Sequence, residues 1–197
     1  MEGGDLFHLL PRASDMPIPE ATSIFHYKDE RVSRLVWAIK YKKSLKGASL
    51  AAHSLYRILS SFESVIPEGM RMLIIPMPIA KARRRERGYN QCELILNEIE
   101  KSDSQKFFIF NKNLLERVRH TSRQTLKDRR ERLESIQAIF AVNEKALAAL
   151  ANTNPNLNGF FVVVIDDVIT TGSTMRDAIG TLRNAGFKNT YGLSFAH

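Results

Sequence analysis

The 197-residue sequence contains a single cysteine, Cys92, and so has little sulfur chemistry available to it. One cysteine excludes an internal disulfide framework and any zinc site built from several thiolates. The longest apolar run, residues 160–165, is far too short to cross a bilayer. The N-terminal residues lack the basic and apolar regions of a signal peptide. We therefore expect a cytoplasmic protein with no membrane insertion.

The sequence also lacks the two most common nucleotide-binding motifs. It has no GxxxxGK[ST] stretch, which excludes a P-loop nucleotide triphosphatase, and no GxGxxG stretch, which argues against a dinucleotide-binding fold. What it has instead is an ordinary globular composition, with 44% hydrophobic and 25% charged residues.

The positive charge is concentrated in two segments. The net charge is +8. Residues 81–87 hold five basic residues and one acidic residue, and residues 117–132 hold seven basic and two acidic residues. These two segments account for the whole excess, which indicates a polyanionic partner: a nucleic acid or a small molecule with several phosphates.

Apolar strand patterns alternate with helical patterns along the chain. We expect strands at residues 21–27, 72–78, 107–110, 138–142, 160–166 and 190–196. We expect a first helix that begins at Asp29 or Ser33 and, after an interruption at Gly47, a second helix over 49–62. Further helices are expected over 90–100, 126–136 and 174–184. Two strands are apolar throughout, which is typical of a parallel sheet covered on both faces. The sequence predicts an α/β fold with a loose arm at 1–20 and one domain at 21–197.

The stretch FFVVVIDDVITTGST, residues 160–174, predicts a binding site. Asp166 and Asp167 end a buried strand, where ligands of parallel sheets bind. Carboxylates accept hydrogen bonds from a vicinal diol. The following residues, Thr170, Thr171, Gly172, Ser173 and Thr174, enter a helix and can hold a phosphate through N–H and hydroxyl groups. The pattern indicates a ribose 5-phosphate site; the alternative is that the carboxylates only cap a loop.

The two basic segments allow more than one function. The first segment suits a pyrophosphate group, because arginine makes bidentate contacts with phosphates; its arginines are Arg83, Arg84, Arg85 and Arg87. A solvated basic loop or a nucleic-acid contact would have the same composition. Residues 117–137, with Arg119, Gln124 and Arg129, predict either a hood that closes over the site or an exposed helix that follows a phosphate backbone.

The stretch VVVIDDVITTGST resembles the phosphoribosyl-pyrophosphate (PRPP) motif of type I phosphoribosyltransferases. The resemblance implies that Asp166 and Asp167 bind the ribose hydroxyls and that residues 170–174 bind the 5-phosphate. It also implies Mg²⁺ that enters with the substrate, and a parallel sheet flanked by helices with a small hood region.

The order of motifs resembles the ComF family of competence-associated proteins. IFHYKDERVSRLVWAIKYKK, a PMP strand, RRRERGYNQ, the basic segment and the PRPP motif follow one another over residues 22–197. Members often begin with a four-cysteine zinc module, which this sequence lacks, so we expect no zinc. The resemblance implies a phosphoribosyl transfer to an unidentified acceptor. Alternatively, it implies a non-catalytic role in natural transformation, handling single-stranded DNA with a helicase partner and a recombination mediator.

Overall fold

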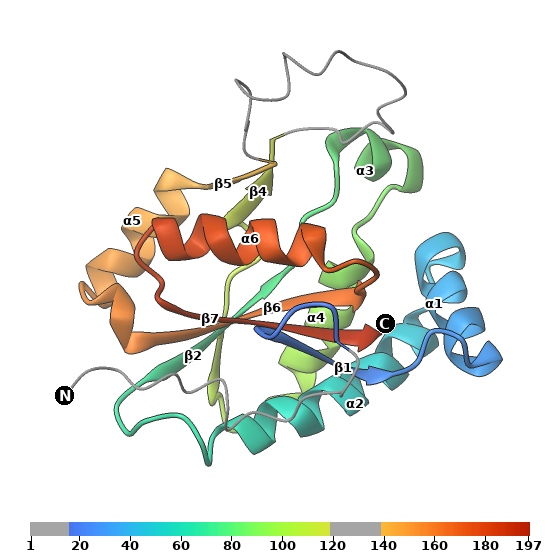
Figure 1. Cartoon of the computed structure of the whole chain (residues 1–197), viewed down its shortest axis with the longest axis horizontal. Helices are drawn as coiled ribbons and strands as arrows, with labels where there is room; N and C mark the ends of the chain where they lie inside the picture. Colours follow the sequence, from blue (N-terminus) through green and yellow to red (C-terminus); the bar gives the residue numbers. More distant parts are fainter. Residues whose placement is uncertain (1–15, 119–138) are drawn as a thin grey trace.

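A computed structural model describes residues 16–118 and 139–197 as an α/β fold built on a five-stranded sheet (Figure 1). The strand order is β1 (Ala21–Phe25), β7 (Asn189–Ala196), β6 (Phe160–Val168), β2 (Arg71–Pro76) and β3 (Phe108–Phe110). All neighbouring strands in this sheet are parallel. The predicted parallel sheet is confirmed, and the architecture is consistent with a type I phosphoribosyltransferase-like fold.

Helices cover both faces of the sheet. Three helices pack on one face, namely α1 (Glu30–Lys42), α2 (Leu45–Phe62) and α4 (Gln91–Ser102). The other face is covered by α5 (Glu144–Thr153) and α6 (Ser173–Asn184), beside a short antiparallel pair, β4 (Leu115–Arg117) and β5 (Phe140–Val142). The predicted strand at 138–142 therefore forms outside the main sheet.

Strand β6 explains why its sequence is apolar without alternation. Phe161, Val163 and Ile165 point into the core beneath α1, α2 and α4. Phe160, Val162 and Val164 point into the core beneath α6. Because β6 lies between β7 and β2, both of its faces are buried, and its carboxyl end opens between the two helical layers.

Three local features differ from the sequence-based expectation. The first two helices separate at Lys43, which has φ 50°, and Ser44 then caps α2 by accepting the Gly47 N–H; Gly47 therefore lies inside the helix rather than in the break. The arginine-rich loop is a short helix, α3 (Lys81–Arg87). Helix α5 forms where no helix was expected from the sequence, and Asn143 caps it by accepting the Ala146 N–H.

The predicted arm and hood fall largely on residues that the structure does not describe. Of the arm at 1–20, residues 16–20 are described, and Ile18 among them is fully buried in the core beneath α6. Arg119, Gln124 and Arg129 of the hood lie outside the described residues. Within the two described ranges, none of the helices has the length and apolar character needed to cross a membrane.

Candidate functional site

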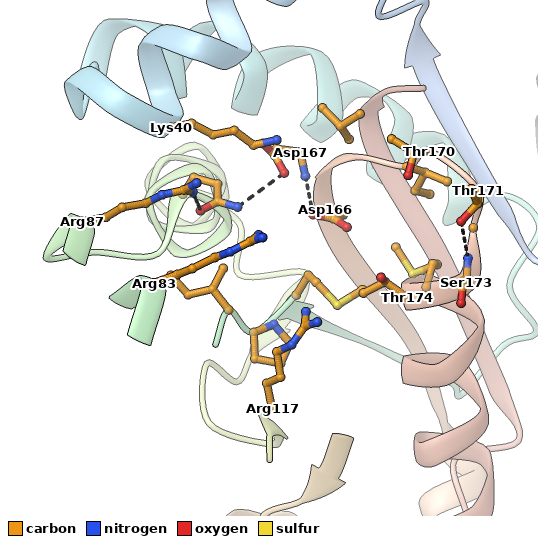
Figure 2. Close-up of a pocket in the computed structure, with 18 of the residues that line it drawn as sticks. Lys40, Arg83, Arg87, Arg117, Asp166, Asp167, Thr170, Thr171, Ser173 and Thr174 are labelled. Carbon is orange, nitrogen blue, oxygen red and sulfur yellow. Dashed lines mark hydrogen bonds and ion pairs between the residues drawn. The ribbon is translucent and has the colours of Figure 1, made fainter. Parts of the chain in front are cut away.

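The two aspartates predicted from the sequence lie at the carboxyl end of β6, in the floor of a pocket of about 370 Å³ (Figure 2). Both side chains are almost fully buried. Asp166 Oδ1 accepts the backbone N–H of Asp167 (2.8 Å) and the thiol of Cys92 (3.4 Å). Gln91 donates to Asp167 Oδ1 at 3.5 Å. The pair is therefore built into the junction of β6 and α4.

A lysine that the sequence did not single out completes this cluster. Lys40 Nζ lies 2.9 Å from Asp167 Oδ2, and the two side chains are 23% and 4% exposed. Lys40 comes from the last turn of α1, on the opposite side of the pocket from the β6–α6 loop (Figure 2). The sequence contains one indication of this role, which is that Lys40 lies next to Val36 and Ile39 on the buried side of α1. This indication is weak, because a lysine at such a position commonly extends its ammonium into solvent.

The electrostatics of the cluster keep it close to neutral. Burial raises the pKa of Asp166 to about 8, and the neighbouring Asp167 carboxylate adds to the increase. Burial alone would lower the pKa of Lys40, but the attraction of Asp167 outweighs it, so this pKa is raised. Burial also raises the pKa of Cys92 well above its usual value, so it remains a thiol. At neutral pH the cluster thus combines one ion pair with a protonated Asp166.

The hydroxyl-rich loop leads directly into the N-terminus of α6. Gly172 has φ 75° and directly precedes the helix, so the backbone turns sharply at the point where the first N–H groups have no carbonyl partner within the helix. The Thr171 hydroxyl accepts the Ser173 N–H at 3.4 Å. All five predicted residues, 170–174, line the pocket. The role of these residues in phosphate binding stays a prediction.

The arginines predicted as one group divide between two faces of α3. Arg83 and Arg87 line the pocket, and Figure 2 shows them across the aspartates from the hydroxyl loop. Arg84 instead forms an ion pair with Glu93 of α4 at 2.6 Å, and Arg85 does not line this pocket. Arg117, the last residue of β4 and the first residue of the second basic segment, also lines the pocket. Burial, followed by the nearby Arg83, lowers the pKa of Arg117.

The ends of α1 and α3 are joined by contacts around Arg87 and Tyr89. Arg87 Nη1 donates to Gln91 Oε1 at 3.3 Å, and its guanidinium lies 4.9 Å from the centre of the Tyr41 ring, which also lines the pocket. Tyr89 donates to the Ile39 carbonyl at 2.7 Å. The RRRERGYNQ stretch thus connects the arginines of the pocket to the helix that carries Lys40.

The donor set suits a metal that arrives with a ligand. Among the described residues, the one cluster of metal-ligand types within 4.8 Å of one another is Cys92, Asp166 and Asp167. Mg²⁺ prefers oxygen ligands in an octahedron, so a thiol is unsuitable, and Lys40 already neutralises Asp167. These residues do not form a closed protein cage, so Mg²⁺ would have to be held mainly by ligand oxygens and water, and its binding stays a prediction.

Two known competence proteins are similar in sequence to this chain. No protein-family model matches the chain. Competence protein F of Haemophilus influenzae is 32% identical over 167 residues, which are 83% of this chain and 66% of that protein. Competence protein ComFC of Bacillus subtilis is 28% identical over 127 residues, which are 64% of this chain and 44% of that protein. The chain thus spans slightly less than two thirds of the first relative and under half of the second. On the similarity to these two competence proteins, the chain belongs to the ComF family.

Proposed function

We propose that the pocket binds PRPP together with Mg²⁺. The observation that carries the proposal is the convergence of three different groups on one pocket: the carboxylate pair, the loop at 170–174, and the arginines of α3. The loop would hold the 5-phosphate, Asp166 and Asp167 would accept the ribose hydroxyls, and Arg83 and Arg87 would face the diphosphate. Such an order matches the spatial order of the groups across the pocket (Figure 2).

We further propose that the bound ligand donates its phosphoribosyl group to an acceptor still to be identified. Departure of pyrophosphate from the anomeric carbon leaves an electron-poor ribose, so catalysis depends on orientation and on stabilising the charge of the leaving group. The loop and the aspartates would orient the sugar. Arg83, Arg87 and Arg117 would stabilise the departing diphosphate. Mg²⁺ would supply further neutralisation of the diphosphate oxygens.

Calorimetric titration of PRPP with Mg²⁺ tests the binding proposal. We expect saturable binding to the wild type and a loss of at least about 100-fold in the Asp166→Asn/Asp167→Asn variant, because it removes both carboxyl groups that would accept the ribose hydroxyls. The matched control is Glu63→Gln/Glu68→Gln, which removes two negative charges from an exposed region outside the pocket. Wild-type affinity in the aspartate variant would show that the site is assigned wrongly.

A second candidate function, single-stranded DNA binding in natural transformation, is supported by a surface next to the pocket. Residues 31–62 contain seven lysines and arginines and no acidic residue. On this surface Trp37 and Tyr41 are about half exposed, and their rings lie 5.9 Å apart. Lys42 lies 5.4 Å from the Trp37 ring. Exposed rings beside cations can stack bases and contact phosphates, which the basic segments, with few aromatic residues, cannot do alone.

Both relatives are named competence proteins, which supports a role in competence. The helicase partner comes from the family resemblance of the sequence. Fluorescence anisotropy with a labelled oligonucleotide in a salt series tests DNA binding. We expect binding that weakens steeply with salt and a loss of about 5- to 100-fold in Trp37→Ala. Phe107→Ala is the control, because Phe107 is equally exposed and lies elsewhere. Equal effects of both substitutions would contradict base stacking on this surface.

A further inference from the structure

Lys40 contacts the phosphoribosyl motif from a helix that the motif does not include. Its Nζ lies 2.9 Å from Asp167 Oδ2 and so occupies one of the oxygen atoms that a ribose diol would use. The Asp167 side chain is almost completely enclosed, whereas the Lys40 side chain keeps about a quarter of its surface open to the pocket. Lys40 can therefore turn toward a ligand without unpacking the core.

The turn that carries Lys40 is fixed by the arginine-rich segment. The Tyr89 hydroxyl donates to the Ile39 carbonyl at 2.7 Å and accepts the Lys43 N–H at 3.1 Å. Lys43 closes the helix in the left-handed conformation, and its N–H also bonds to the Ala38 carbonyl. The backbone on both sides of Lys40 is thus tied to the residue that directly follows the arginine helix and its closing Gly88. Only the side chain of Lys40 is left to respond to a ligand.

Ligand chemistry decides whether Lys40 can release Asp167. A ribose 5-phosphate whose hydroxyls take over Asp167 would leave the ammonium without an anionic partner in a partly buried position, which is unfavourable. A ligand that also carries a diphosphate supplies a new partner in the same pocket. The exchange of Asp167 for a diphosphate oxygen keeps the ammonium of Lys40 paired with an anion, and the freed Asp167 oxygen then accepts hydrogen bonds from the ribose hydroxyls.

We infer that Lys40 determines ligand specificity by exchanging Asp167 for the diphosphate of the ligand, so that the pocket favours a ribose 5-phosphate that carries a 1-diphosphate over one that does not. The inference rests on the proposed function and adds to it a residue and a selectivity. The competing interpretation is that Lys40 only holds Asp167 in place. In that case its loss weakens every ribose phosphate in the same proportion.

The test is the ratio of dissociation constants for ribose 5-phosphate and PRPP, measured by calorimetry with Mg²⁺. We expect Lys40→Met to lower this ratio by about 10- to 100-fold, the effect of one charge-assisted contact made by PRPP alone. Lys40→Arg should keep the ratio within about threefold of the wild type. Lys28→Met, which removes an exposed lysine just before α1 and outside the pocket, should leave it unchanged.

The variant Lys40→Met/Asp167→Asn guards against misfolding, because it leaves neither buried charge unpaired. Its ratio should be as low as that of Lys40→Met, whereas Asp167→Asn alone should weaken both ligands and keep the ratio high. A wild-type ratio in both Lys40→Met and Lys40→Met/Asp167→Asn would refute the inference, while the proposal that the pocket binds PRPP would stand. Absence of PRPP binding by the wild type would instead refute the proposed function, and this inference with it.

Discussion

Replacing Gly172 by alanine should destabilise the protein by about 2–5 kcal/mol. Gly172 has φ 75°, a conformation that costs a residue with a Cβ about 1–2 kcal/mol. The new Cβ would also lie 2.7 Å from Ile18 Cγ2 and 3.2 Å from Pro17 Cγ. Ile18 is fully buried, so it cannot simply swing away, and such overpacking typically costs about 1–3 kcal/mol. Urea denaturation followed by circular dichroism measures the total.

The steric part of this prediction has its own control. Ile18→Ala alone should cost about 2–5 kcal/mol as a buried large-to-small change. In the double variant the new Cβ has room, because the Ile18 side chain is gone. The double variant should therefore lose about 1–3 kcal/mol less unfolding free energy than the sum of the two single variants. Strictly additive losses would refute the reasoning, since they would mean that residue 172 and Ile18 do not press on one another.

Three further predictions concern the pocket and its support. Because burial holds the pKa of Asp166 at about 8, the free protein carries a proton there at pH 7 that must leave when the carboxylate accepts ribose hydroxyls. PRPP affinity should therefore rise about tenfold from pH 6 to pH 7, about fivefold from pH 7 to pH 8, and then level off. Calorimetry in buffers of different ionisation enthalpy should show the release of the proton, and a flat profile would contradict this. Tyr89→Phe should cost about 1–2 kcal/mol and speed hydrogen exchange at the Lys43 amide, measured by mass spectrometry; unchanged exchange would argue against the tie between α1 and the arginine segment. Arg83→Gln should weaken PRPP binding about tenfold or more, whereas Arg84→Gln, which removes the partner of a glutamate on α4, should change it by less than about twofold; equal losses would contradict the division of the arginines.

The part of the site that was predictable is the part that is contiguous in sequence. Asp166, Asp167 and the loop at 170–174 follow one another along one strand and one turn, so their types and spacing already fix where they lie. The parallel sheet was predictable for the same reason, because a strand buried on both faces must be apolar throughout.

The rest depends on contacts between distant segments. Nothing in the local sequence around Lys40 places its ammonium against Asp167, since that contact joins α1 to the end of β6. The separation of Arg83 and Arg87 from Arg84 follows from helical periodicity, in which residues four apart share a face. That periodicity was hidden because α3 has only seven residues and no side-chain cap at its N-terminus.

The strand order also determines when the pocket can form during synthesis. Strand β1 pairs Ala21 with Gly192, and β2 pairs Arg71 with Phe160, so each half of the sheet joins segments far apart in the chain. Loop closure over such distances is slow and requires the last strand to be available. A ribosome-bound chain that ends before β7 would carry the aspartates on a strand with one neighbour missing. Ligand binding should therefore begin only after almost all of the sequence has emerged, and the motif alone, excised as a peptide, should not bind.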